Sequence, residues 1–160
     1  MVADPPADLT LTPLTGEPRT VSEWLTNFHL LLAVIDPYTN ESAWILKTAA
    51  RVLDNFQQAD VRVAWLVAGD ADDARSFLGP YADEFLTFAD ADRSVVKALG
   101  LGRTPALVHL GTNLKVVGAA EGWNPLEWRA VSDKLATVMS WAKPLVPDRG
   151  DPAPFEGASV

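Results

Sequence analysis

Two hydroxyl side chains near the start of a predicted helix are the first candidates for chemistry. They are Thr39 and Ser42, and they lie in the run Tyr38, Thr39, Asn40, Glu41, Ser42. A hydroxyl acts as a nucleophile near neutral pH only beside a base, and no histidine is near in the sequence. Thr39 or Asn40 instead suits the N-cap of the helix, and the Glu41 carboxylate offsets the positive helix end. We therefore predict helix caps here and no catalytic residue.

The histidines and aspartates do not form a recognisable metal-binding pattern. His29 and His109 have neither a carboxylate nor a second histidine at ligand spacing, so we expect both to serve in packing. The acidic residues at 70–73 and 90–92 open predicted helices and lack the spacing of a calcium loop. The sequence therefore predicts no bound metal and no cofactor.

Cysteine chemistry is excluded by composition. The 160 residues contain no cysteine. Disulfides, thiolate nucleophiles, cysteine-ligated zinc, iron–sulfur clusters and dithiol redox cycles all need that sulfur atom. Thiol-based catalysis is therefore impossible for this chain, and we do not expect an enzyme of that type.

Charge and hydropathy narrow the class of partner. The formal net charge is -8 and the pI is near 4.6, which disfavours binding to phosphate backbones and anionic lipid. Residues 1–8 contain acidic residues and prolines where a signal peptide needs a basic start and an apolar stretch. The longest apolar run, Leu30–Ile35, is far shorter than the ~20 residues that span a bilayer. We expect a cytoplasmic protein that binds neither nucleic acid nor membrane.

The chain length suits one domain, since domains usually have ~100–150 residues. Its two ends, residues 1–8 and 147–160, are rich in proline, glycine, aspartate and alanine and have little to bury. We expect both to be disordered tails around a single domain at residues 9–146.

Hydrophobic periodicity predicts alternating strands and helices between these tails. The expected strands are 9–14 with a hairpin partner at 19–21, and then 30–35, 61–67, 85–88, 106–110 and 114–117. A short turn or helix is expected from Ser22, and longer helices at 39–56, 71–78, from Asp90 or Asp92 to Leu99, and 124–142. Buried strands that alternate with helices and end in an antiparallel hairpin indicate an α/β fold with a central mixed sheet, covered on both faces.

Four stretches of the chain occur in an order that a known family shares. They are the N-terminal hairpin Leu11–Val21, the strand-to-helix run Ala33–Ser42, the segment Phe88–Leu101 and the run Thr104-Pro105-Ala106-Leu107-Val108. Together they resemble the thioredoxin fold, and more closely its redoxin branch, which holds peroxiredoxins and TlpA-type thiol–disulfide proteins. The last run resembles the family's Thr-Pro loop, whose proline is cis. The resemblance covers about residues 9–142 and implies a thioredoxin-like fold with an N-terminal β-hairpin extension.

The resemblance also locates the missing sulfur. Thr39 and Ser42 stand where the family has Cys-x-x-Cys at the start of its long helix. In a peroxiredoxin alignment, the same residues are the Thr-x-x-Cys motif with Ser42 in place of the peroxidatic cysteine. That motif expects a proline seven residues earlier, where this chain has Ile35. We therefore favour the TlpA-like alignment.

The resemblance and the missing sulfur together suggest a redox-inactive thioredoxin-like protein that binds a protein or peptide, or serves as an accessory protein. An exposed Thr104 backbone beside Pro105 would pair with an extended peptide by strand addition. The expected binding face, which is the family's active-site face, consists of Tyr38, Thr39, Asn40, Glu41, Ser42, Thr104 and Pro105. Two alternatives stay open: a redoxin-class enzyme with a non-cysteine site, and a structural homodimer joined through Trp44 or Trp123.

Overall fold

A central mixed sheet organises the molecule. Its strands are β1 (Thr10–Pro13), β2 (Arg19–Thr20), β3 (His29–Ile35), β4 (Val61–Val67), β5 (Leu86–Ala89), β7 (Ala106–Leu110) and β8 (Val116–Glu121). The computed structural model describes residues 2–160, and within them these seven strands have the order β2-β1-β5-β4-β3-β7-β8. β3, β4 and β5 run parallel, while β7 is antiparallel to β3 and β8 is antiparallel to β7. The predicted α/β fold with a mixed sheet is confirmed.

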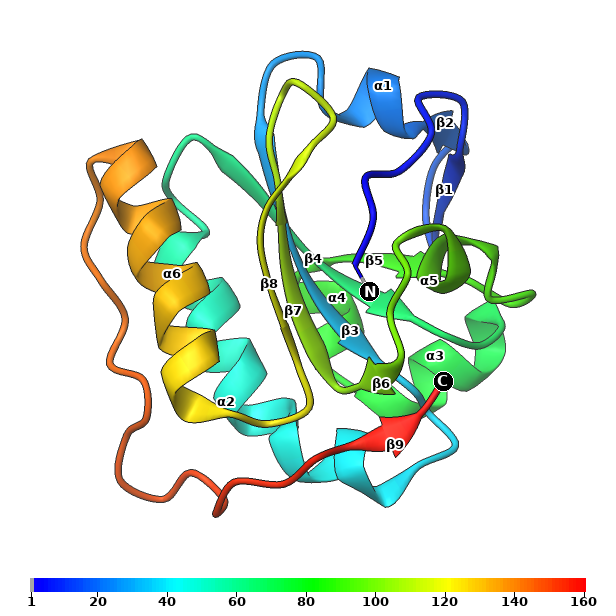
Figure 1. Ribbon diagram of the computed structural model, residues 1–160. Coiled ribbons are helices and arrows are strands. Elements are labelled where there is room, and N and C mark those ends of the chain that lie inside the picture. Colours follow the sequence, from blue (N-terminus) through cyan, green and yellow to red (C-terminus); the bar gives the residue numbers. More distant parts are fainter. Residues whose placement is uncertain (1) are drawn as a thin grey trace.

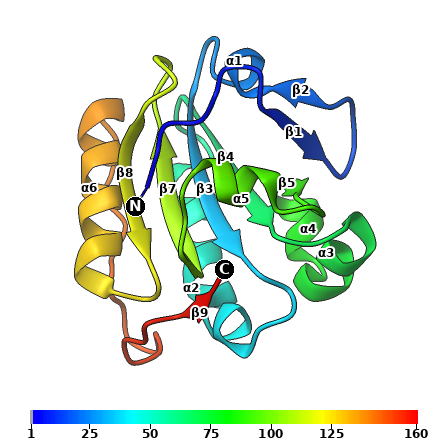
Figure 2. The ribbon, with the colours of Figure 1, turned by 45° about the vertical axis from the view of Figure 1, so that its right-hand side comes forward.

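Helices cover both faces of this sheet. They are α1 (Val21–Trp24), α2 (Asn40–Phe56), α3 (Ala71–Leu78), α4 (Tyr81–Glu84), α5 (Ser94–Ala98) and α6 (Pro125–Met139). Figure 1 shows α2 and α6 along one face, and Figure 2 shows α1 and α5 on the opposite side. None of the helices in residues 2–160 is long and apolar enough to cross a membrane.

The interior strand β3 is apolar from Leu30 to Ile35 because both of its faces are buried there. Side chains alternate across a strand, so its odd and even residues contribute to different cores. Leu31, Ala33 and Ile35 join the core under α2 and α6, while Leu30, Leu32 and Val34 join the core under α1 and α5.

The tryptophans divide between core and surface. Trp65 is fully buried, and so are Trp123 and Trp128, whose rings meet edge-on with centroids 5.2 Å apart. Trp123 was one of the two residues expected to join subunits of a homodimer. That expectation is wrong for Trp123, because its side chain has no exposed surface. Trp44 is 56% exposed and remains available for a contact.

The start of the last predicted sheet strand differs from the prediction. The strand expected at 114–117 begins instead at Val116, because Leu114 adopts a left-handed backbone with φ 67°. The turn before it closes with a hydrogen bond of 2.9 Å from the Gly111 N–H to the Lys115 carbonyl. β8 then continues to Glu121, so the final hairpin is longer than the sequence indicates.

Both ends of the chain, expected to be disordered, are hydrogen-bonded to the domain. At the N-terminal end, the Ala3 N–H donates to the Leu99 carbonyl at 2.8 Å. Met1, the first residue of that expected tail, lies outside the described residues. At the C-terminal end, β9 (Ala158–Ser159) pairs with β6 (Arg103–Thr104) in a second, two-stranded sheet. The prediction missed these contacts because it weighed apolar side chains, whereas the ends are held mainly by main-chain and polar groups.

Candidate functional site

Helix α2 begins with the cap that the sequence predicts. Thr39 is the N-cap, and its Oγ1 accepts a hydrogen bond of 3.4 Å from the Ser42 N–H. The same hydroxyl donates to the Asp36 carbonyl at 3.2 Å. Glu41 lies in the first turn, where its charge complements the positive end of the helix. In the part of the chain that the structure describes, neither the Thr39 hydroxyl nor the Ser42 hydroxyl is hydrogen-bonded to a base that could activate it.

Ser42 is a structural residue and cannot contact a partner. Its side chain is 0% exposed, and its hydroxyl accepts a hydrogen bond of 2.8 Å from the Asp36 N–H. The buried Asp36 carboxylate in turn accepts from the Tyr38 N–H (2.9 Å) and the Arg93 guanidinium (2.7 Å). These bonds hold the turn between β3 and α2. The expectation that Ser42 belongs to the binding face is therefore corrected by its burial.

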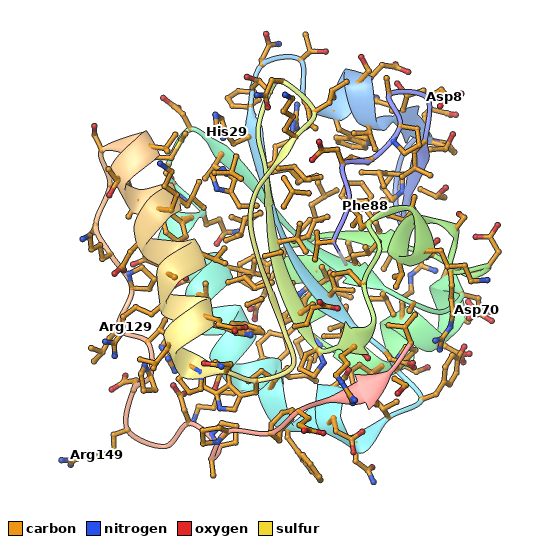
Figure 3. All side chains as sticks on the ribbon, in the orientation of Figure 1. Asp8, His29, Asp70, Phe88, Arg129 and Arg149 are labelled. Atoms are coloured by element: carbon orange, nitrogen blue, oxygen red, sulfur yellow. The ribbon has the colours of Figure 1, made fainter. Side chains whose placement is uncertain are left out.

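Tyr38 is the most prominent side chain beside this turn. Its ring is 60% exposed, and its hydroxyl donates to the Asp73 carboxylate on α3. Asp70, which Figure 3 labels, is the N-cap residue of that helix. The hydrogen bond to Asp73 raises the pKa of the Tyr38 hydroxyl, and burial and the charges of Asp73 and Asp70 add to the increase. Asn40 is also exposed, so these two residues present side chains that a partner can reach.

The Thr104-Pro105 loop lies where the sequence analysis expected it, but it is not open. The peptide bond between the two residues is cis, and both residues are buried. Thr104 pairs with Ala158 of β9 in the antiparallel ladder. The Thr104 Oγ1 is buried and has no hydrogen-bond partner within residues 2–160. The backbone expected to be exposed is therefore occupied by the chain's own C-terminal segment.

This segment, residues 151–160, is called the C-terminal strap below. In Figure 1 it follows the long connection after α6, passes below α2 and ends beside β6. Trp123 and Phe155 exchange two main-chain hydrogen bonds of 2.9 and 3.1 Å, and the Trp123 indole donates to the Pro152 carbonyl at 2.8 Å. Sequence reasoning missed the strap, although Phe155 is the single aromatic residue among residues 147–160 and marks an apolar contact.

A charged clamp fixes the beginning of the strap on α2. The Asp151 carboxylate accepts hydrogen bonds from the Thr48 hydroxyl (2.8 Å) and from two Arg51 nitrogens (2.6 and 2.8 Å). Burial by itself raises the pKa of the Asp151 carboxyl, but hydrogen bonds from Arg51, the Asp148 N–H and Thr48 outweigh it, so that the pKa is lowered. The carboxylate therefore stays charged near neutral pH, and its ion pair with Arg51 is kept.

A groove of about 640 Å³ borders the strap on the side of α6. Its walls include Pro154 and Phe155 of the strap, Arg103 of β6, and Pro125 and Leu126 at the start of α6. Leu126 is well exposed there. The strap thus forms one wall of the groove. It also pairs with the backbone of β6 at Thr104, and this stretch of β6 backbone is called the Thr104 edge below.

The two histidines meet at the opposite end of the sheet. His29 Nδ1 lies 2.8 Å from His109 Nε2, because β3 and β7 pair with Leu31 opposite His109. Burial, together with the neighbouring His29 and Lys134 charges, lowers the pKa of His109 to about 4. In Figure 3, His29 lies at the upper end of the sheet, whereas β9 is at the lower end. The pair is therefore remote from the candidate face, and among residues 2–160 no group of three or more potential metal ligands comes together.

Comparison with known proteins shows a likeness at the level of structure. No family model and no curated protein sequence matches the chain. A secreted disulfide oxidoreductase from Mycobacterium tuberculosis matches with TM-score 0.60 and 18% identity, over 84% of this chain and 96% of that one. The bacterioferritin comigratory protein of Xanthomonas campestris, with alkyl peroxide reduction activity, matches with TM-score 0.65 and 16% identity, over 89% and 98%.

A third structure matches over nearly the whole chain. It is a hypothetical protein from Sinorhizobium meliloti, with TM-score 0.69 and 18% identity, over 99% of this chain and 93% of that one. At such identities the likeness shows a shared fold. The fold is thioredoxin-like, as the sequence analysis predicts, and this chain has it without any cysteine.

Proposed function

We propose that this chain, a thioredoxin-like fold without cysteine, is a redox-inactive protein that binds extended polypeptide at the face around Tyr38 and Thr104. One observation carries the proposal: the Thr104 edge already holds an extended segment, since β9 pairs with β6 in antiparallel register. Strand addition uses main-chain hydrogen bonds, so an edge that pairs with one extended segment has the groups to pair with another in its place.

The residues expected to form the face take different roles in this proposal. Tyr38 and Asn40 are exposed and offer side-chain contacts, and Thr39 and Glu41 are half-buried at the start of α2. Thr104 offers its main chain. Ser42 and Pro105 are buried, and they shape the face from beneath. The proposal therefore depends most on Tyr38 and on the Thr104 backbone.

Two alternatives were left open by the sequence analysis, an enzyme with a non-cysteine site and a homodimer. A redoxin-class enzyme with a non-cysteine site would need Thr39 or Ser42 as its reactive group. Ser42 is buried, and the Thr39 hydroxyl is engaged with the Asp36 carbonyl and the Ser42 N–H. We therefore prefer the binding role. A homodimer through Trp44 stays a prediction, which sedimentation of the purified chain tests.

The proposal is tested with a library of extended heptapeptides, screened by fluorescence anisotropy against the wild type. Tyr38→Ala should weaken the selected peptides, while Tyr38→Phe, which keeps the ring and loses the bond to Asp73, should retain most of the binding. Val138→Ala is a control, because Val138 is exposed on α6. If no peptide binds, or if Tyr38→Ala binds every peptide as the wild type does, the proposed face is wrong.

Enzymatic assays give a second, independent test. Insulin reduction and peroxide turnover should both equal those of a heat-inactivated sample, because neither thiol cycle can run without cysteine. Turnover above that background would contradict a redox-inactive protein.

A further inference from the structure

Two glycines allow the strap to cross the end of the sheet with backbone against backbone. A Cβ on Gly157 would lie 2.5 Å from the Thr104 carbonyl oxygen and 3.1 Å from the Gly122 Cα. A Cβ on Gly122 would overlap the Glu156 carbonyl oxygen. Both glycines also have a positive φ, +88° and +72°, which favours glycine. A segment that takes this path therefore needs a glycine at the crossing.

Phe155, two residues before Gly157, adds a side-chain contact between the strap and the domain. The Phe155 ring meets the Trp44 ring edge-on, with centroids 5.5 Å apart and planes at 81°. Phe155 is also the strap residue whose main chain pairs with Trp123. Aromatic pairs in this geometry contribute beyond simple burial. The position therefore favours an aromatic side chain.

The residues after the glycine are held through their main chain. Ala158 and Ser159 pair with β6, and the Val160 N–H donates to the Gly102 carbonyl at 3.0 Å. The Arg103 guanidinium donates to the Gly157 carbonyl at 3.1 Å. These contacts require an extended backbone, and they do not require a large side chain at the positions after the glycine.

We infer that the Thr104 edge selects extended segments in which an aromatic residue stands two positions before a glycine and small residues follow, and that residues 155–159 are the resident copy of this pattern. The inference rests on the proposed function, because it names the partner class of the same face. An occupied edge cannot hold a second segment, so a partner binds by displacing the strap. The apparent dissociation constant then equals the intrinsic constant divided by the fraction of molecules whose strap is released.

The test uses the full chain and a fluorescent peptide with the sequence of residues 154–160. The double variant Phe155→Ala/Gly157→Ala weakens the chain's own strap, and it should bind the peptide about tenfold more tightly than the wild type, or better. Gly150→Ala is the matched control: Gly150 also has a positive φ, +91°, but a Cβ there would meet no atom within 4 Å. It should bind the peptide as the wild type does. A peptide with alanine at both the aromatic and the glycine position should lose at least about tenfold in affinity.

A second measurement needs no variant and serves if the double variant does not fold. Excess unlabelled peptide is added to isotopically labelled wild type, and amide exchange is followed by nuclear magnetic resonance. The Phe155 and Val160 amides should lose protection as the strap is displaced. The Gly122 amide, which donates to the Pro105 carbonyl at 2.7 Å within the domain, should keep its protection.

The outcomes separate this inference from the proposed function. If the alanine-substituted peptide binds as well as the natural one, or if the Phe155 and Val160 amides stay protected at saturating peptide, the inferred pattern is wrong. Selection of unrelated peptides by the same face would then leave the proposed function standing. If neither the strap peptide nor any library peptide binds to the double variant or displaces the wild-type strap, both proposals fall.

Discussion

The buried histidine at the end of β7 makes the stability of this protein depend on pH in a defined direction. His109 has no exposed surface, and its pKa is lowered from 6.5 to about 4. Its folded form therefore binds a proton less readily than its unfolded form. The corresponding stability is fully present above pH ~6.5 and is lost as the pH falls from there towards 4.

The magnitude follows from the two pKa values. At pH 5 the unfolded imidazole is almost fully protonated, whereas the folded one is mostly neutral. Proton linkage with these values lowers the free energy of unfolding by about 2 kcal/mol between pH 7 and pH 5. The pKa of His29 is also lowered, by burial, so it acts in the same direction. Carboxyl groups with ordinary pKa values near 4 change little over this interval.

Urea unfolding at pH 7 and pH 5 measures this effect. The wild type should lose about 2 kcal/mol, and His109→Gln, which keeps a nitrogen near the Nε2 position without a titrating ring, should lose less than half as much. His29→Asn, which keeps a nitrogen near the Nδ1 position and leaves His109 in place, should retain most of the loss. If the wild-type free energy of unfolding changes by less than about 0.5 kcal/mol, His109 is not held neutral by burial and the reasoning is refuted.

Three further predictions concern the candidate face and the strap. Thr39→Ala removes the N-cap of α2 and should lower the free energy of unfolding by about 1 kcal/mol in urea melts, with Thr39→Ser close to wild type. Ser42→Ala leaves the Asp36 N–H without its acceptor and should cost about 1–3 kcal/mol in the same assay; no loss would mean that this hydrogen bond contributes nothing. Asp151→Asn breaks the ion pair with Arg51, so hydrogen exchange at the strap amides should become at least about tenfold faster while β3 amides keep their protection. Unchanged strap exchange would show that the clamp does not hold the strap.

Apart from α4, β6 and β9, the elements and their order could be predicted because their signals are local. β4 and α3 occupy the predicted residues, since apolar runs and the Asp70 cap are read from neighbours in the chain. The Thr39 cap of α2 was predictable for the same reason. The absence of cysteine is a matter of composition, and composition alone is enough to exclude thiol chemistry.

The state of the candidate face was decided by tertiary structure. Burial of Ser42 and occupation of the Thr104 edge depend on which segments meet in space, and the strap residues that meet Thr104 lie more than 50 positions away in the sequence. The same holds for the His29–His109 contact, which exists because strand pairing brings two residues 80 positions apart within 2.8 Å.

One physical reason separates the features that the sequence predicts from those that it does not. Local propensity and capping involve residues within one or two helical turns, so composition and spacing reveal them. Strand pairing across the molecule depends on register and on which backbone groups remain unpaired after the core has formed. The sequence by itself thus determined a thioredoxin-like frame without cysteine. The tertiary structure decided that the Thr104 edge of this frame is occupied by the chain's own C-terminal strap.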